Sequence, residues 1–275
     1  MPSIFKAKTQ EGHTIKSFGE LLQHNIKTAC FEINENGIYL RQMDTHRRIL
    51  ADACLLKENF ITYKFKSEER LFIGLNLNHF HKMLKSIKKK DSLTLFINED
   101  NPSKLGIIIH PKENQRISTS YIQIQSQQNI EISLPTGYST PSIVPSNEYQ
   151  KMCKEMLTIG SVINIKSKNS CIKFICDGAG IYSREVMFGE VGLSHDDSSD
   201  DENENDEFKE YYDTEQLYRI IKISGICTQL QIYTKNSLPL LFKCNIGNLG
   251  TLQLFIKSKS QVEMEEIQEN TITLN

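Results

Sequence analysis

Two kinds of hydrophobic spacing recur along the chain, in the same order in each half. Residues 15 to 29 carry apolar side chains at helical spacing with polar side chains between them, which is typical of an amphipathic helix. Residues 30 to 43 instead alternate on either side of Asn36-Gly37, a dipeptide that favours a tight hairpin turn. The pattern therefore predicts a helix followed by a β-hairpin.

The first half continues with strands and a second helix. Strands are expected near residues 50–65 and 70–74, because apolar and β-branched side chains concentrate there. Asn76 or Asn78 can cap a helix that buries Phe80. A further pair of strands completes this unit near the middle of the chain.

The second half, from about residue 143 to 256, repeats the plan with different residues. Ser146 opens a helix that buries Tyr149, residues 162–176 form a hairpin, and Asp213 begins another helix. Strands follow near residues 230–234, 240–245 and 251–257. The predicted fold class is α+β, with two similar domains that each pack two helices on antiparallel sheet. Such a repeat has approximate symmetry, which suits a periodic partner such as double-helical nucleic acid.

The chain is long enough for two domains of ordinary size. It has 275 residues, 39% of them hydrophobic, so each half can bury a core. Residues 123–142 are rich in Gln, Ser and Pro and predict an extended connector. The expected domains are 1–122 and 143–260, and residues 261–275 are expected to be an acidic, frayed tail.

Composition favours a soluble intracellular protein. No apolar run is long enough to cross a membrane, and the first residues alternate like a strand and do not resemble a leader peptide. Seven cysteines, an odd number without a CxxC pair, fit a reducing compartment, and all seven are expected to pack in the core.

Charge is distributed unevenly, although the net charge is only -2. Residues 1 to 120 hold 19 Lys and Arg against 13 Asp and Glu, whereas residues 121 to 275 hold 13 against 21. Nine of those 21 acids fall between Asp196 and Glu210, a stretch that predicts a solvated loop. Net charge therefore neither supports nor excludes a nucleic-acid partner.

The usual motifs of catalysis and cofactor binding are missing together. No glycine-rich phosphate loop, HExxH or GxSxG occurs. His79 and His81 lie two apart on a predicted helix and cannot share a metal ion. We therefore predict a protein that is not an enzyme and that binds no cofactor and no metal.

All four predicted helices instead turn Lys or Arg outward, and acids on the same faces are few. Such cations hold phosphates without reading sequence, which suits loosely bound duplex DNA. Each neutralised phosphate contributes about -0.9 to the salt slope, so a few contacts are easily abolished. Durable attachment would then require a closed ring. The predicted DNA-facing residues are Lys16, Lys27, Lys82, Lys85, Lys89, Lys151, Lys154, Arg219 and Lys222.

Several stretches carry a family resemblance. They are Phe31–Asp44, Gly74–Leu77, Lys82–Lys85, Leu134-Pro135, Ser146–Lys154, Leu238–Leu240 and Gly247–Leu254. Together they resemble the proliferating cell nuclear antigen family, the eukaryotic-type DNA sliding clamps. The resemblance implies a duplicated DNA-clamp fold and a homotrimeric ring around duplex DNA, in the nucleus or at a site of viral DNA replication. Such a ring tethers DNA polymerase and other replication and repair proteins, and a clamp loader opens it using ATP.

The resemblance also implies two protein-binding surfaces. The expected subunit interface comprises Gln115, Ile117, Thr119, Tyr121, Gly180, Tyr182 and Arg184. The expected groove for partner peptides comprises Met43, Arg47, Leu50, Leu134, Pro135, Tyr138, Leu238, Pro239, Phe255 and Lys257. Arg47, Arg48 and Lys257 replace less basic residues of the family, which predicts a preference for acidic residues beside the bound peptide.

Three other interpretations remain open from the sequence. The strongest is a subunit of a heterotrimeric checkpoint-type clamp, which differs from a homotrimer in the mass of the assembly. The others are an enzyme with an unrecognised site and a membrane-bound or protein-binding scaffold that uses the acidic loop. An open strand edge is also compatible with a monomer.

Overall fold

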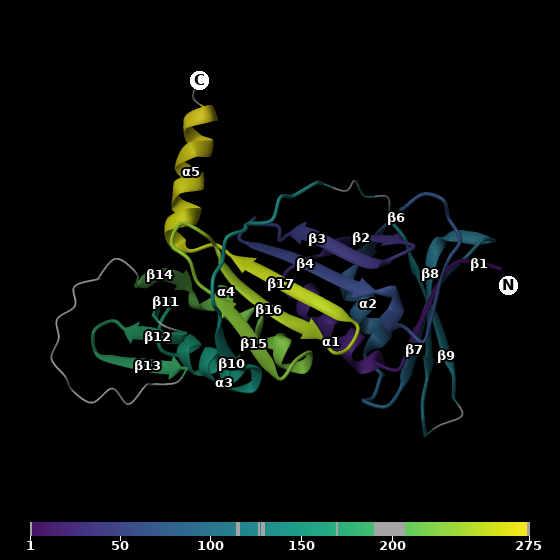
Figure 1. Ribbon diagram of the computed structural model, residues 1–275, viewed down its shortest axis with the longest axis horizontal. Helices are drawn as coiled ribbons and strands as arrows, with labels where there is room; N and C mark the ends of the chain where they lie inside the picture. Colours follow the sequence, from purple (N-terminus) through teal and green to yellow (C-terminus); the bar gives the residue numbers. More distant parts are fainter. Residues whose placement is uncertain are drawn as a thin grey trace. The chain divides into compact units, whose positions relative to one another are not determined.

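The computed structural model describes residues 2–113, 116–125, 127, 130–168, 170–189 and 207–273 (Figure 1). The chain forms two compact units, and each takes segments from distant parts of the sequence. Unit 1 comprises Met1–Ser133, Lys222–Cys227 and Cys244–Leu254. Unit 2 comprises Leu134–Ile221, Thr228–Lys243 and Phe255–Asn275.

Unit 1 contains a five-stranded antiparallel sheet in the order β5-β1-β7-β8-β9. Its strands are β1 (Ser3–Thr9), β5 (Thr62–Phe65), β7 (Ser92–Asn98), β8 (Asn101–His110) and β9 (Ser118–Gln123). Apolar side chains alternate along these strands, as burial of one sheet face requires. Phe5, Ala7, Leu93 and Ile107 are almost fully buried, so they belong to the core beneath this sheet.

A second group of strands in unit 1 follows the order β17-β4-β3-β2-β6. The strands are β2 (Thr28–Asn34), β3 (Gly37–Met43), β4 (Ile49–Leu56), β6 (Leu71–Asn76) and β17 (Gly250–Ile256). The predicted hairpin is confirmed, but its turn is not the predicted one. Asn34 pairs with Gly37, so Glu35 and Asn36 form the two-residue loop, and neither has a positive φ. Asn36-Gly37 therefore marks the end of the turn and not its centre.

Two helices of unit 1 pack against each other, α1 (Gly12–Gln23) and α2 (Leu77–Leu84). They approach closely because Gly19 has no side chain: a Cβ there would lie 3.2 Å from the Phe80 ring. The predicted cap of α2 is confirmed, since the Asn76 side chain accepts a hydrogen bond from the His79 amide.

The prediction that helical spacing in the first helix continues to Ala29 is wrong. The amides of Asn25 and Ile26 both donate to the Leu22 carbonyl and end the helix, and the chain turns into β2. Ala29 then pairs with Leu75 on β6. Ala29 is therefore buried by packing of the sheet. Its position in the sequence matched the spacing of the apolar residues in the preceding helix only by coincidence.

Unit 2 contains a four-stranded antiparallel sheet in the order β13-β12-β11-β14 and a strand group in the order β10-β15-β16. The first sheet contains β11 (Val162–Lys168), β12 (Cys171–Gly178), β13 (Tyr182–Phe188) and β14 (Phe208–Asp213). The second group contains β10 (Ser142–Pro145), β15 (Gln229–Tyr233) and β16 (Leu240–Ile246), whose last residues belong to unit 1.

The core of unit 2 centres on Tyr149 of α3 (Ser146–Leu157), as the helical period predicted. Its ring contacts Phe174 and Phe242, with centroids 6.4 and 5.4 Å apart. The buried hydroxyl donates to the Leu217 carbonyl on α4 (Thr214–Tyr218), so this one side chain joins both helices to the core. These helices and antiparallel sheets confirm the predicted α+β class.

Three further expectations from the sequence are corrected. The helix after Asp213 is only the five residues of α4, and Lys222 lies in a separate 3₁₀ segment, η3 (Ile221–Gly225). The acidic tail forms helix α5 (Lys259–Thr273), where fraying was expected. Cys54, Cys171 and Cys227 are only partly buried, although the other four cysteines lie in the core; none of the seven forms a disulfide.

The expected connector has little regular structure in its described part. Ile130–Pro141 contain neither helix nor strand, and Gln125 forms only an isolated bridge with Gly74. Residues 190–206, which include the greater part of the predicted acidic loop, lie outside the described residues. In the described part of the chain, no helix is sufficiently long and apolar to cross a membrane.

Candidate nucleic-acid interface

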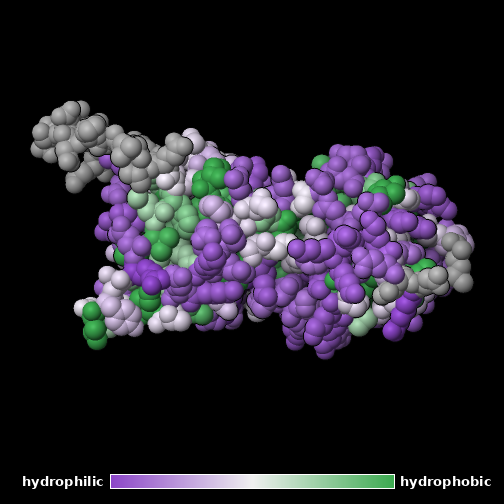
Figure 2. All heavy atoms as spheres, turned by 90° about the horizontal axis from the view of Figure 1, so that it is seen from below, coloured by the Kyte–Doolittle hydropathy of each residue, from purple (hydrophilic) through white to green (hydrophobic). Residues whose placement is uncertain are grey.

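Five of the nine predicted DNA-facing cations extend into solvent. They form no ion pair with any described residue. Figure 2 shows one face of the molecule, on which hydrophilic residues predominate. Four of these five cations belong to unit 1 and one to α3 of unit 2. These five unpaired lysines are Lys27, Lys82, Lys85, Lys89 and Lys154.

Lys82 and Lys85 border a polar hollow of about 380 Å³ on unit 1 that His79 and His81 also line. Burial lowers the pKa of His81, and the charges of Lys16 and Lys85 lower it further, although Glu20 opposes them. His81 is therefore neutral at physiological pH. Lysine provides the positive charge beside this hollow.

Lys16 has a different role from the predicted one. Its Nζ donates to the carbonyl oxygens of Lys85 and Ile87, at 2.9 and 3.1 Å. These carbonyls lie just beyond the last turn of α2, where a cation can satisfy oxygens that lack helical partners. Lys16 therefore joins α1 to the end of α2, and its charge is only half-exposed.

The other three predicted cations are paired with acids in their own unit. Lys222 lies 2.7 Å from Glu20 in unit 1. Burial disfavours the ionised Glu20 carboxylate, but the hydrogen bond and charge of Lys222 outweigh this effect and lower its pKa. In unit 2, Lys151 pairs with Glu148 at 2.8 Å, and Arg219 pairs with Glu215 at 3.1 Å. Their fields at a phosphate are correspondingly weaker.

Each unit also has a strand edge that carries predicted interface residues and that no described strand covers, although β5 and β14 form the opposite edges of the same two sheets. β9 ends the five-stranded sheet and β13 ends the four-stranded sheet. Large apolar side chains are exposed along or beside both edges. Their exposed fractions are 59% for Ile117, 57% for Tyr121, 83% for Ile181, 55% for Tyr182 and 44% for Met187.

The remaining predicted interface residues are mostly at these edges. Thr119 is exposed on β9, and Gly180 adopts a φ of 74° in the turn before β13, a conformation that favours glycine. Arg184 on β13 forms an ion pair with Glu155 of α3. Gln115 lies outside the described residues.

The predicted peptide-groove residues fall into two sets, one in each unit. In unit 1, Met43 pairs across the strands with Leu50. The buried Asp44 accepts hydrogen bonds from the amides of Arg48 and Ile49 and fixes the turn that carries Arg47, whose φ is 54°. Arg47 is exposed at this turn.

The groove residues of unit 2 gather around Tyr138. Its hydroxyl donates to the Pro239 carbonyl at 2.6 Å, and its ring lies 6.3 Å from the Phe255 ring. Burial raises the pKa of Tyr138, so this hydroxyl remains a donor. The other predicted members, Leu134, Pro135 and Leu238, are partly buried.

Sequence reasoning missed a contact of Lys257. Its amine lies 2.6 Å from Glu265 of α5, and the next lysine, Lys259, pairs with Asp213 at 3.2 Å. The spacing of residues in the acidic tail could have predicted helix α5, but the tail contains few hydrophobic residues, so no amphipathic pattern was recognised. The predicted basic groove residue is therefore partly neutralised within its own unit.

Comparison with known proteins gives matches along nearly the whole chain. The family model described as proliferating cell nuclear antigen, N-terminal domain, matches residues 4–131, and the one described as proliferating cell nuclear antigen, C-terminal domain, matches residues 134–259. A proliferating cell nuclear antigen of Chaetomium thermophilum is 23% identical over 263 residues, covering 93% of this chain and 98% of the relative. A probable DNA polymerase sliding clamp of Paramecium bursaria Chlorella virus 1 is 23% identical over 254 residues, covering 92% and 96%.

Proposed function

The chain belongs to the proliferating cell nuclear antigen family and is a sliding clamp, and we propose that three copies of it close into a ring around duplex DNA. The observation that carries this proposal is the pair of strand edges formed by β9 in unit 1 and β13 in unit 2, where large apolar side chains are exposed. Exposed edges with apolar side chains pair readily with another chain. Pairing β9 of one copy with β13 of the next is head-to-tail, and a head-to-tail contact gives a closed ring when its rotation closes after three copies.

Weak electrostatic contact with DNA supports the same function. The five unpaired lysines carry flexible point charges, which hold phosphates without fixing a register. Each contact contributes about -0.9 to the salt slope and is lost and remade as the protein moves. The ring therefore remains on DNA through enclosure, while its affinity stays low enough for sliding.

The proposed attachment residues for partner peptides are the set around Tyr138 in unit 2 and the set with Met43 and Leu50 in unit 1. DNA polymerase, a clamp loader and other replication or repair proteins would bind there, and the clamp would perform no chemistry of its own. The proposed location is the nucleus or a site of viral DNA replication. Arg47 and Arg48 support a preference for acidic flanking residues, whereas the Lys257–Glu265 pair reduces it. A peptide array in which acidic flanks give no gain would contradict that preference.

The oligomeric state is the first test. Size-exclusion chromatography with light scattering is expected to give three times the chain mass of 31.6 kDa for the purified protein. A monomer that assembles only with two different subunits would favour a heterotrimeric checkpoint-type clamp. A matched variant with Ile117→Lys, just before β9, and Tyr121→Lys, on β9, is expected to be monomeric, because charges at this exposed edge disfavour strand pairing.

A further inference from the structure

The five-stranded sheet of unit 1 has a second face, opposite to the one that covers the core. Helix α1 packs on the core side, since a Cβ at Gly12 would lie 3.3 Å from the Cβ of Leu93. Side chains alternate between the two faces of a strand, so Lys6 points away from the side that buries Phe5 and Ala7. Residues directly opposite each other in a ladder share a face, so strand pairing identifies the rest of this side, here called the open face.

One row of residues crosses all five strands on the open face. The paired residues, in order from β5 to β9, are Lys64, Lys6, Phe96, Gly106 and Tyr121. Neighbouring strands lie about 4.8 Å apart, so the row is about 19 Å long. It begins with two cations and includes two aromatic side chains.

The glycine in this row allows the two aromatic rings to meet. A Cβ at Gly106 would overlap the ring of Phe96, so the ring occupies the space above this glycine. The Tyr121 ring lies edge to face with it, with centroids 6.0 Å apart. Phe96 is half-buried and Tyr121 is exposed. An exposed aromatic ring is a surface on which a nucleic-acid base can stack.

The open face is also positively charged. Lys6, Lys64 and Lys104 are exposed, Lys8 is half-buried, and none of them forms an ion pair with a described residue. No Asp or Glu occurs within the five strands as the structure describes them. Burial lowers the pKa of His110 on β8, and the charges of Lys8 and Lys6 lower it further. These strands therefore attract an anionic ligand.

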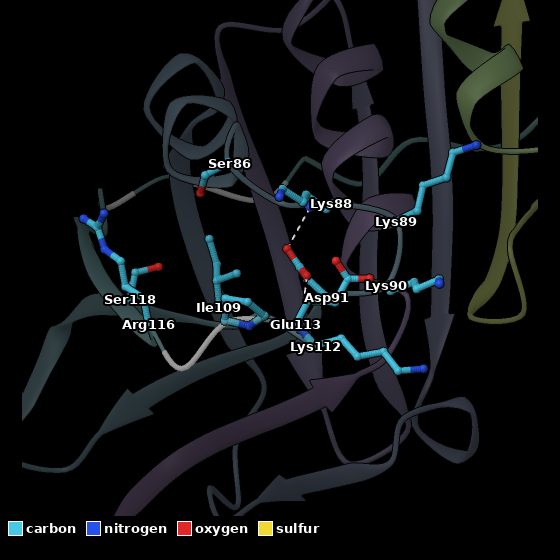
Figure 3. Close-up of a pocket in the computed structure, with 11 residues that line it drawn as sticks. Ser86, Lys88, Lys89, Lys90, Asp91, Ile109, Lys112, Glu113, Arg116 and Ser118 are labelled. Atoms are coloured by element: carbon cyan, nitrogen blue, oxygen red, sulfur yellow. Dashed lines mark hydrogen bonds between the residues drawn. The ribbon is translucent and has the colours of Figure 1, made fainter.

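A pocket in the same unit provides a contrast, because it has cations without aromatic side chains (Figure 3). Its volume is about 430 Å³, and the described residues that line it include Lys88, Lys90, Lys112 and Arg116. Asp91 accepts hydrogen bonds from the amides of Lys88 and Lys112, at 2.8 and 3.3 Å, and holds the two loops together. Cations alone attract any anion, whereas cations beside aromatic rings favour an anion that also carries bases.

We propose that the open face binds single-stranded nucleic acid, with phosphates on Lys6, Lys8 and Lys64 and a base stacked on Tyr121. Bases in a duplex stack on one another, whereas those of a single strand can turn outward onto an aromatic ring. A row of about 19 Å accommodates several nucleotides, since stacked nucleotides of one strand are about 3.4 Å apart. The site gives the clamp a place to hold an unpaired strand.

This site is separate from the helix faces proposed for duplex DNA. It does not depend on the proposed ring, because all its residues belong to unit 1. It is also compatible with the ring. Pairing at the β9 edge uses backbone groups in the plane of the sheet, while the Tyr121 side chain stands on its face.

A comparison of two charge variants tests the phosphate contacts. Fluorescence anisotropy with a labelled thymidine oligonucleotide of about 12 nucleotides measures the dissociation constant, in about 0.15 M salt to screen distant charges. The K6Q/K8Q/K64Q variant is expected to raise this constant about tenfold, because three phosphate contacts are lost. The K88Q/K90Q/K112Q/R116Q variant removes more charges from the pocket but is expected to raise it less than about twofold. An equal or larger effect of the pocket variant would overturn the inference.

A fluorescent reporter tests the stacking. The protein contains no tryptophan, so an introduced one reports on its own surroundings. Fluorescence of the Tyr121→Trp variant is expected to be quenched by the thymidine oligonucleotide and much less by an abasic oligonucleotide of the same length, which has phosphates but no bases. Phe72→Trp is the matched control, because Phe72 is an exposed aromatic residue on β6 and lies outside the row. Its fluorescence is expected to stay unchanged with both ligands.

Equal quenching by the thymidine and abasic oligonucleotides, or equal quenching in both reporter variants, would overturn the inference. Polyglutamate that displaces the oligonucleotide at equal charge concentration would also overturn it and would assign the open face to an acidic protein partner. A uridine ribo-oligonucleotide in the same assays distinguishes the two sources of the ligand. Tighter binding of the deoxyribose strand indicates DNA, and tighter binding of the ribose strand indicates RNA.

Discussion

The helices of the two units have similar basic residues but use them differently. In unit 1, Lys82, Lys85 and Lys89 form no ion pair among the described residues, and Lys16 joins α1 to the end of α2. In unit 2, the corresponding cations are mostly paired with acids on the same helix, such as Lys151 with Glu148. Repetition of a fold therefore does not repeat its electrostatic field. Unit 1 is expected to supply most of the attraction for DNA.

The largest expected effect comes from removing the charges of each unit separately. The K82Q/K85Q/K89Q variant removes three unpaired cations, whereas K151Q/K154Q/R219Q removes one unpaired cation and two paired ones. Each lost phosphate contact reduces the salt slope by about 0.9. The reduction is therefore expected to be about three times larger for the unit 1 variant, measured by fluorescence anisotropy with short duplex DNA across a salt series. Equal reductions would remove the distinction between the units.

A smaller effect is expected on folding stability from the capping role of Lys16. The Lys16→Met change leaves the carbonyls of Lys85 and Ile87 without this donor and should cost about 1 kcal/mol of unfolding free energy, since the site is partly exposed. Lys27→Met is the matched control, because Lys27 is exposed and should change stability by less than about 0.5 kcal/mol. Urea unfolding measures both. If the two variants are equally stable, Lys16 has no capping role.

The Glu20–Lys222 pair predicts a pH-dependent difference. Because the pKa of Glu20 is lowered in the folded protein, its contribution is present above the unfolded value near 4.5 and is lost as pH falls through the folded value. At neutral pH the Glu20→Gln variant should be less stable than wild type by under about 1 kcal/mol. This gap should disappear once the pH lies below the lowered pKa of Glu20 in the folded protein, because the wild-type carboxyl is then protonated. A gap independent of pH would mean that the ion pair is not its source.

The smallest effect is expected from Glu148→Gln on α3, which frees the exposed Lys151 from its partner. Lys151 then resembles a lysine of unit 1, and the salt slope should steepen by at most about 0.9 for one additional phosphate contact. The same anisotropy series measures it. Glu58→Gln, in η1 (Lys57–Asn59), is the control and should leave the slope unchanged. A slope that becomes shallower would contradict the proposed effect of pairing.

Local patterns predicted much of the fold. The buried face of α3, the cap of α2 by Asn76, one of the two residues that the sequence offered, and the strands of both hairpins follow from short-range spacing; only the turn of the first hairpin differs from the predicted one. Errors arose where one apolar residue fits two periods, as at Ala29, or where a helix changes to a 3₁₀ segment before Lys222. Tertiary packing decides the structure in those cases, and a short stretch of sequence carries no information about that packing.

The electrostatic details of the site were harder to predict. The sequence identifies cations on helix faces, but it does not reveal that Lys16 reaches carbonyls about 70 positions away or that Lys222 meets Glu20. The Lys257–Glu265 pair also depends on α5, whose acidic composition suggested a frayed end. Ion pairs between distant segments require the folded structure. The unpaired lysines, in contrast, are those whose neighbours in sequence lack a suitably spaced acid.

Retention on circular DNA tests most directly whether enclosure holds the clamp on its substrate. The protein is loaded onto nicked circular duplex by a compatible clamp loader, separated from free protein by gel filtration in moderate salt, and compared before and after a restriction cut. The ring account predicts stable retention on the circle and rapid loss from the linear product, because the ring slides off the ends. Equal retention on circular and linear DNA would contradict it, since the protein would then be held by affinity.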